Sequence, residues 1–587
     1  MDRLSLLMEV SSVHRISLKS HSGDSDKKQT EEGGDRYKPK RPSYFKGLEN
    51  FIKGGKQIMI KKTLVFVVVV LIGFFVTTSS GLGKEQATLT YGNNQIVRTL
   101  DPIKTICVES MALVWNMYDP LVMIDPADPE KLKPVVAERW EVSENGKVWT
   151  FYLRKGIKFT TGNELTAKDV AFSLKRGIEA NYPVYPPYGK FLDPDKGIKI
   201  IDDYTIQMTL KVPFIGWGKL LARSQAGIVD SKALKPHMTE EDPYGSNYLN
   251  DHSLGSGPFK LKEWIRDQKI ILVRNEEYWG EKYGIRVPKI DQLVDLNVPE
   301  PTTQKMMLER GDIDVAMELS VDMAAQYEKN PVPHIKVVRV PVFIGTSILM
   351  NPSYPPFADP KVRKAIRYAI DYDSITNELL KGFAIRMDEP IYKGFVGWQE
   401  KVWYGYDLEK AKKLMAESNY PNGFSFTISI GTGLGVGVPW EILALKEKED
   451  LAKIGIDMKI EQYDWSVMDE QLFSGNYQAQ QNWVGCFFPD TEGAMSLFGR
   501  PATSVVLKPN GWKCQAVDEL ADIAMIESDP VVRAAIYHAI NEIFAELGPN
   551  AFILQQVKPI VARSNIKGFE NITPGLEVFN WWALYKK

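Results

Sequence analysis

Apolar residues recur at the periods of strands and helices from residue 84 to the end of the chain. In the stretch DDYTIQMTLK every second residue from Tyr204 to Leu210 is apolar, and the residues between them are polar. This period of two predicts a strand with one buried face. The stretch AERWEVSENGKVWTFYLR holds two apolar-rich runs joined through Asn145-Gly146. Both residues of that pair tolerate positive φ, so the stretch predicts a hairpin.

Capping residues mark where several helices begin. TAKDVAFSLKR begins with Thr166 and carries Asp169 three residues later, which is the spacing of a capping box. ADPKVRKAIRYAIDYDSI has Asp359 as its predicted N-cap and Pro360 in the first turn, where proline is favoured. The buried stripe predicted for this second helix consists of Val362, Ala365, Ile366, Ala369 and Ile370.

Strand and helix signals alternate toward the C-terminus. A capped helix in YDLEKAKKLMAESNYPNG leads into a strand in FSFTISI, and two more helices are predicted in VPWEILALKEKEDLAKIGI and DPVVRAAIYHAINEIFAEL. Hairpins dominate early and strand–helix alternation dominates late. The pattern therefore predicts an α/β fold.

The N-terminal segment shows a different pattern. A basic head at Lys61 and Lys62 precedes 13 apolar or Gly residues from Leu64 to Val76, and small residues follow. This order predicts a secretory signal peptide over residues 59–83, with an uncleaved membrane anchor as the alternative. No Cys follows the apolar run until Cys107, so no lipoprotein anchor is predicted. Residues 1–58 are polar and predict a disordered tail, and we hypothesise that translation starts at Met59.

Composition adds few constraints beyond these. The chain has 587 residues, of which 44% are hydrophobic and 25% charged, with a formal net charge of −2. These values are ordinary for a globular protein of two to four structural units. No basic run interleaved with aromatic residues follows residue 62, so nucleic acid is not an expected partner. The three cysteines, Cys107, Cys486 and Cys514, cannot all pair, which excludes a disulfide framework.

The motifs of catalytic and metal sites are missing from the sequence. His residues lack the spacing of paired metal ligands, and neither a GxSxG nor a Walker A motif occurs. We therefore predict neither a metal site nor a cofactor, and no enzyme. Glycines fall at every second position from Gly431 to Gly437, which does not match the dinucleotide fingerprint. We interpret this stretch as a flexible loop, of the kind that often borders a ligand cleft.

Two pairs of carboxylates occur in turn-like contexts. GDIDVA contains Asp312 and Asp314, and DPADPE contains Asp125 and Asp128. Neither pair has the 12-residue pattern of a calcium loop. Both are interpreted as solvated turns.

Several motifs together resemble a known family. They are WNMYDPLVMID, PVVAERWEVSENGKVWTFYLRKGIKFTTGNELTAKDVAFSLKR, GSGPFKLKEWIRDQKIILVRNEEYWG, LERGDIDVA, NPSYPPFADPKVRKAIRYAIDYDSI and YDLEKAKKLMAESNYPNGF. In this order, from about Tyr91 to Phe569, they resemble the extracellular family 5 solute-binding proteins of peptide-type ABC importers.

The resemblance implies a fold, a function and a location. The fold is a two-lobed periplasmic binding protein of type II with an extra subdomain in the first lobe. By analogy, lobe one takes residues 84–129, 255–347 and 560–587, the extra subdomain takes residues 130–254, and lobe two takes residues 348–559. The implied function is capture of an oligopeptide or oligosaccharide-like solute by an exported monomer, in the periplasm or outside the cell, and its delivery to ABC permease subunits. A sensor or chaperone-like protein without an importer is the alternative.

The stretch NWVGCFFPD carries the implied ligand site. Peptide-binding members have Trp, two residues, and then an Asp that pairs with the peptide's α-amino group. Here Trp483 and Gly485 match, but Cys486 stands at the Asp position. A buried ammonium without a carboxylate costs several kcal/mol, and a neutral thiol supplies no compensating charge. Asp490 replaces the anchor if the loop is remodelled, whereas Cys486 as a small buried hydrophobe is the structural interpretation.

Aromatic residues complete the predicted site. Trp483 and Phe487 are expected either to contact the ligand or to pack in the core, and Trp398 and Trp403 are candidates for stacking on sugar rings or apolar groups. The predicted ligand-binding residues are therefore Trp483, Gly485, Cys486, Phe487, Asp490, Trp398 and Trp403.

Overall fold

The computed structural model describes residues 86–105, 107–182, 188–435, 437–486, 488–504, 506–572 and 579–587. The predicted tail of residues 1–58, the predicted signal peptide or anchor of residues 59–83, and Phe487 lie outside these described residues. Among the helices of the described ranges, none has both the length and the apolar character needed to cross a membrane.

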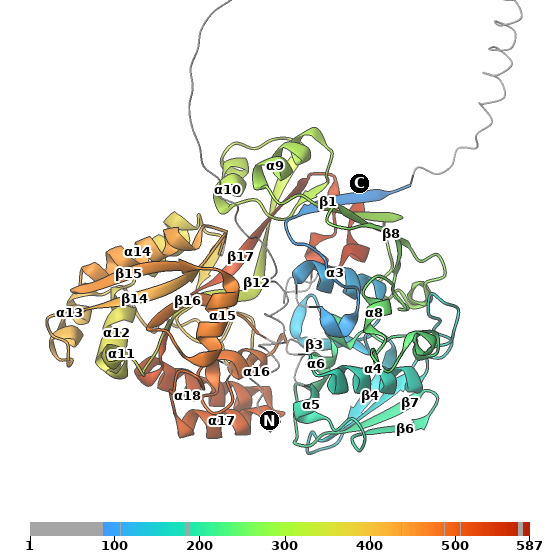
Figure 1. Cartoon of the computed structure of the whole chain (residues 1–587), viewed down its shortest axis with the longest axis horizontal. Helices are drawn as coiled ribbons and strands as arrows, with labels where there is room; N and C mark the ends of the chain where they lie inside the picture. Colours follow the sequence, from blue (N-terminus) through green and yellow to red (C-terminus); the bar gives the residue numbers. More distant parts are fainter. Residues whose placement is uncertain are drawn as a thin grey trace, which may run out of the picture. The chain divides into compact units, whose positions relative to one another are not determined.

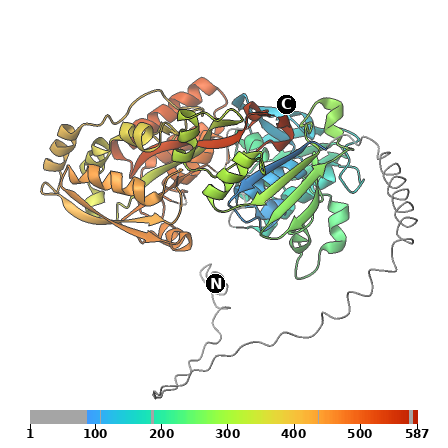
Figure 2. The ribbon, with the colours of Figure 1, turned by 90° about the horizontal axis from the view of Figure 1, so that it is seen from above.

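Two long antiparallel strands stand at the centre of an 11-stranded sheet. They are β12 (Ile335–Met350) and β17 (Asn550–Arg563). On one side follow β16 (Ala479–Val484), β14 (Phe424–Gly431) and β15 (Ile456–Tyr463). On the other side follow β11 (Val315–Ala316), β1 (Thr88–Asn93), β10 (Gln292–Asn297), β9 (Lys269–Arg274) and β8 (Phe259–Ile265), while β13 (Ala384–Arg386) pairs with β17. The two central strands thus connect two groups of strands that come from different parts of the chain (Figures 1 and 2).

Helices of the later part of the chain pack on the first group of strands, on the central strands or on one another. They are α12 (Pro360–Ala369), α13 (Leu408–Ala416), α14 (Trp440–Ala452), α15 (Trp465–Ser474), α17 (Gln515–Ile526) and α18 (Pro530–Leu547). The N-cap of α12 is Asp359, whose side chain accepts from the Lys361 N–H at 2.8 Å. All residues of the stripe predicted for α12 are buried. The sequence-based prediction of this helix is therefore confirmed.

Other helices pack on the second group of strands. They are α3 (Val108–Met117) and α9 (Pro301–Arg310), which contact β8 and β11, whereas α10 (Val321–Lys329) contacts the central strands β12 and β17. Residues of β1, β9, β10 and α3 share one apolar core cluster with residues of the C-terminal segment, such as Trp581. Tyr91 of β1 stacks on Trp581, with ring centroids 4.2 Å apart. The end of the chain therefore packs against its first described strand.

A separate four-stranded sheet lies within residues 130–254. Its strand order is β4-β5-β7-β6, with β4 at Ala137–Val142, β5 at Val148–Leu153, β7 at Thr205–Thr209 and β6 at Ile198–Asp202. β4 and β5 form the predicted hairpin, and Gly146 in its turn has φ of +66°. In α4 (Ala167–Ala180) the Thr166 N–H donates to Asp169 Oδ2 at 2.9 Å, which completes the predicted capping box. Both predictions are confirmed.

One carboxylate differs from its prediction as a solvated turn. Asp314 is buried, where it accepts from the Thr90 N–H at 2.8 Å and from Lys586 Nζ at 2.9 Å. The parallel pairing of β11 with β1 draws this residue into the sheet. Its neighbour Asp312 is exposed, as expected, and pairs with Arg310.

Candidate ligand-binding site

Strand ends from both groups of strands meet around a cavity of about 560 Å³. β14 runs parallel to β16, and β1 runs parallel to β11. The cavity lining includes Asn94, Met317 and Gly485, directly beyond the carboxyl ends of β1, β11 and β16, and Leu434, three residues beyond the end of β14. Open α/β sheets bind their ligands at the carboxyl ends of parallel strands. The location of the cavity therefore indicates a ligand site.

The lining contains both polar and apolar residues. It includes Asn94 and Gln95 after β1, Leu434, Gly435 and Gly437 after β14, and Gln556 of β17. The Gly-rich loop that was predicted to border a ligand cleft thus borders this cavity. Side-chain amides offer both hydrogen-bond donors and acceptors, so Asn94, Gln95 and Gln556 suit a ligand with amide or hydroxyl groups.

Trp483 provides an aromatic wall. It is half-buried at the end of β16 and lines the cavity. Its ring meets the buried ring of Trp440 edge-on, with centroids 5.1 Å apart at 87°. Trp440 in turn meets Trp465 edge-on at 5.7 Å. This chain of rings fixes the orientation of Trp483, whose other surface is available to the cavity.

Gly485 leaves part of the cavity open. A Cβ atom built on Gly485 has no heavy atom within 4 Å, apart from its chain neighbours. Its φ is not in the left-handed region, so the backbone tolerates a side chain there. The residue lines the cavity next to Trp483. A larger residue at this position would fill ligand space without backbone strain.

Cys486 lies behind the wall instead of in the cavity lining. Its side chain is buried in an apolar cluster with Phe343 and Tyr392, and its Sγ lies 3.9 Å from the Phe343 carbonyl oxygen. Burial raises the pKa of the Cys486 thiol to about 12. The thiol is therefore neutral at physiological pH, and it supplies no negative charge for a ligand amine.

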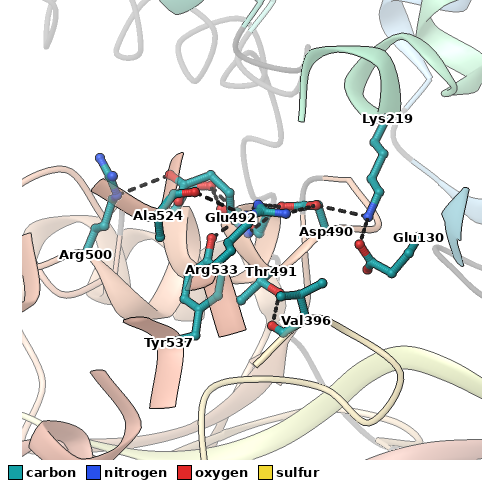
Figure 3. A network of polar contacts seen from close by, with 12 residues as sticks. Glu130, Lys219, Val396, Asp490, Thr491, Glu492, Arg500, Ala524, Arg533 and Tyr537 are labelled. Atoms are coloured by element: carbon teal, nitrogen blue, oxygen red, sulfur yellow. Dashed lines mark hydrogen bonds and ion pairs between the residues drawn. The ribbon is translucent and has the colours of Figure 1, made fainter. Parts of the chain in front are cut away.

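Asp490 is held in an ion-pair network (Figure 3). Arg533 of α18 binds both of its carboxylate oxygens, at 2.6 and 3.2 Å, and Lys219 of α6 (Trp217–Leu221) binds Oδ2 at 3.0 Å. Lys219 also binds Glu130 at 2.7 Å. Burial alone would raise the pKa of Asp490, but Arg533 and Lys219 hold it well below its usual range. A carboxylate that already faces two cations is a poor anchor for a third.

An aromatic contact and a backbone hydrogen bond join the same parts of the chain as this network. Phe488 meets Phe214 edge-on at 5.7 Å, and the Ile215 N–H donates to the Met525 carbonyl at 3.1 Å. Like the Lys219–Asp490 pair, these contacts join residues 130–254 to residues 488–533. We call the Phe214–Phe488, Ile215–Met525 and Lys219–Asp490 contacts together the distal contact, because none of their residues belongs to the central strands β12 and β17. Figure 1 shows α6 and α16 (Thr491–Ala494), the helices next to the Lys219–Asp490 pair.

The remaining predicted site residues lie elsewhere. Trp398 lines a second cavity of about 240 Å³, with Lys393 Nζ 5.1 Å from its ring centroid. Trp403 is half-buried against the core, and Lys401 Nζ lies 3.5 Å from its ring centroid. Neither residue contributes to the lining of the larger cavity. Of the predicted set, the structure brings Trp483 and Gly485 together at this cavity.

The sequence analysis missed a charged pair in the lining. Lys558 of β17 donates to Glu318, which follows β11, over a distance of 3.0 Å. A signal existed: Lys558 interrupts the otherwise apolar run VKPIVA of a buried strand. A lysine in such a run is rarely buried without a partner.

Comparison with known proteins gives concordant matches. The model of the bacterial extracellular solute-binding proteins, family 5 Middle, matches residues 131–504. The probable D,D-dipeptide-binding periplasmic protein DdpA of Escherichia coli K12 is 28% identical over 84% of this chain and 93% of its own length. The glutathione-binding protein GsiB of Escherichia coli O1:K1 is 26% identical over the same shares.

A solved structure agrees with these matches. The periplasmic binding protein DppA from Helicobacter pylori, in complex with the peptide STSA, aligns with a TM-score of 0.71 and 27% identity. The alignment covers 85% of this chain and 98% of that one.

Proposed function

The chain belongs to family 5 of the bacterial extracellular solute-binding proteins, and we propose that it captures a peptide-type solute in the cavity beside Trp483. Members of this family serve ABC importers, so the protein delivers its solute to membrane permease subunits. The observation that carries the proposal is the position of the cavity, at strand ends from both sides of β12 and β17. A hinge along these two strands lets the sides close on a solute.

The lining and the relatives favour a peptide over an oligosaccharide. Asn94, Gln95 and Gln556 match the alternating N–H and C=O groups of a peptide backbone. The oligosaccharide alternative relied on stacking by Trp398 and Trp403 as well as Trp483, and those two residues lie outside this lining. The relatives are named for a D,D-dipeptide and for glutathione, and the aligned structure holds a peptide.

The location follows from the family. Its members act in the periplasm or outside the cell, and this chain is proposed to do the same as a monomer. The predicted export signal at residues 59–83 serves this location. Trp483 and Gly485 are the proposed ligand contacts, with Cys486 supporting the wall from behind.

Native mass spectrometry of protein purified without refolding tests the proposal. A co-purified mass that matches a peptide supports it, and a mass that matches a sugar contradicts it. Calorimetry with a mixture of di- and tripeptides then measures binding in the unaltered protein and in Gly485→Leu, which fills the cavity. Gly405→Leu is the matched control, because a Cβ at Gly405 also has no neighbour within 4 Å and the residue does not line the cavity. We expect loss of binding in Gly485→Leu alone.

A further inference from the structure

Glu318 and Lys558 are the charged side chains among the described residues that line the cavity. The side chain of Lys558 is 8% exposed and that of Glu318 is 17% exposed. An ion pair so far removed from water loses much of its hydration, and its mutual attraction often does not offset that loss. Replacement of such a pair by apolar residues of similar volume is often neutral or stabilising. The partial exposure of both groups toward the cavity suggests that the pair serves the ligand.

The sheet holds Lys558 directly and brings Glu318 close to it through the pairing of the preceding strand. Ala316 of β11 pairs with Val561 of β17, which places Glu318 beside Lys558. Lys558 itself pairs with Val340 of β12. Lys558 lies on a paired strand, where groups keep their geometry better than on loops, and Glu318 lies two residues beyond the end of β11. The two groups are 3.0 Å apart, from Lys558 Nζ to Glu318 Oε1, and a ligand meets them as a pair.

We propose that this pair selects solutes in which an ammonium and a carboxylate are attached to one carbon. The inference rests on the proposed function and specifies its ligand. The ligand's ammonium lies against Glu318 and its carboxylate against Lys558, so that the four charges alternate in sign. In an α-amino-carboxylate group the nitrogen and the carboxyl carbon are about 2.5 Å apart, close to the spacing of the protein pair.

An ordinary linear peptide does not meet this requirement. Its amine and its terminal carboxylate are separated by at least one peptide unit, and successive Cα atoms are about 3.8 Å apart. Its amine alone would face Glu318 with Lys558 close by, so attraction and repulsion largely cancel. The neutral thiol of Cys486 offers this amine no alternative partner, and Asp490 is already paired with Arg533 and Lys219.

Two isomeric dipeptides test the inference in the unaltered protein. γ-Glutamylalanine carries the amine and a carboxylate on one carbon, whereas α-glutamylalanine has the same atoms and charges without that arrangement. The γ isomer makes charged hydrogen bonds to both Glu318 and Lys558, and the α isomer does not. A hydrogen bond to a charged group contributes about 1.5–3 kcal/mol, so calorimetry should show that the γ isomer binds at least about tenfold more tightly. Equal affinities for the two isomers, or preference for the α isomer, would overturn the inference.

A double variant assigns the preference to the pair. Glu318→Gln with Lys558→Gln removes both charges together, so neither is left buried alone, and we expect the two isomers to bind within about threefold of each other. The control is Glu328→Gln with Arg339→Gln, an ion pair of 2.7 Å outside the cavity lining, which should keep the preference. A melting curve verifies that each variant is folded. Persistence of the preference in the first variant overturns the assignment.

Failure of the inference differs from failure of the proposed function. If neither isomer binds but another peptide does, and Gly485→Leu abolishes that binding, the selection by the charged pair is wrong and the peptide-binding function stands. If no peptide binds at all, both are wrong.

Discussion

Replacing Asp490 by Asn should destabilise the folded protein strongly. The carboxylate is 1% exposed, and it receives Arg533 at 2.6 and 3.2 Å, Lys219 at 3.0 Å and the Glu492 N–H at 2.9 Å. Asparagine has nearly the same shape and keeps the capacity to accept the Glu492 N–H. The change therefore removes the negative charge and leaves the buried cation Arg533 without its carboxylate, while Lys219 keeps Glu130 as an ion-pair partner.

The expected magnitude follows from the uncompensated charges. Breaking a buried ion pair by removal of one partner costs about 3–5 kcal/mol, and we expect a loss in this range for Asp490→Asn. Lys219→Met should cost less, about 1–3 kcal/mol, because Asp490 keeps Arg533 and loses one charged hydrogen bond. Since Lys219 and Asp490 are in contact, the double variant should show a coupling of about 0.5–3 kcal/mol.

Urea unfolding measures these losses, and pH provides a second test. The folded-state pKa of Asp490 lies below its unfolded value of about 3.9, so its stabilisation is complete above that value and is lost only as pH falls through the lower, folded pKa. The difference between the unaltered protein and Asp490→Asn should thus be the same at pH 5 and pH 8. A loss below about 1 kcal/mol, or strict additivity with Lys219→Met, would refute the buried network as described.

Three further predictions concern other parts of the molecule. Burial raises the pKa of Glu447, whose carboxylate accepts from the Gln481 side chain at 2.9 Å, to about 8. The free energy of unfolding therefore falls as pH rises from about 4.5 toward 8, because the unfolded chain releases this proton first. In urea unfolding, Glu447→Gln should be more stable relative to the unaltered protein at pH 9 than at pH 5. Small-angle scattering should give a smaller radius of gyration with saturating solute, and an unchanged radius contradicts hinge closure. Cys107, Cys486 and Cys514 are all free thiols, so reductant should leave the melting temperature unchanged, whereas a fall of many degrees would reveal a disulfide.

Local signals in the sequence predicted the elements that depend on local contacts. The capping box of Thr166 and Asp169 and the buried stripe of α12 involve residues within a few positions of each other. The Gly-rich loop after β14 was likewise predicted from its own glycine pattern to border a ligand cleft. Trp483 at the end of β16, by contrast, was placed near a ligand by the resemblance to family 5, and not by the period of its strand.

Contacts between distant residues were not predicted. Glu318 and Lys558 are 240 positions apart, and Lys219 and Asp490 are 271 apart. Whether such residues meet depends on strand order and register, which the pattern of a single strand does not determine. Asp314 was mistaken for a solvated turn for this reason, since its burial results from the pairing of β11 with β1. The role of Asp490 likewise depends on Lys219, which a different part of the chain supplies.

The distal contact has a consequence for how strongly any solute binds. Its members, among them Lys219, Phe488 and Asp490, do not line the cavity, so its free energy is the same whichever solute is present. If the two sides open along the central strands, as proposed, the opening breaks this contact, and the strength of the contact then contributes to the fraction of empty molecules that are already closed. The apparent dissociation constant equals the intrinsic one divided by the competent fraction, and each change of about 1.4 kcal/mol alters an equilibrium tenfold. Substitutions at this contact can thus retune the affinity for every solute by one common factor while the order of preference among solutes stays the same.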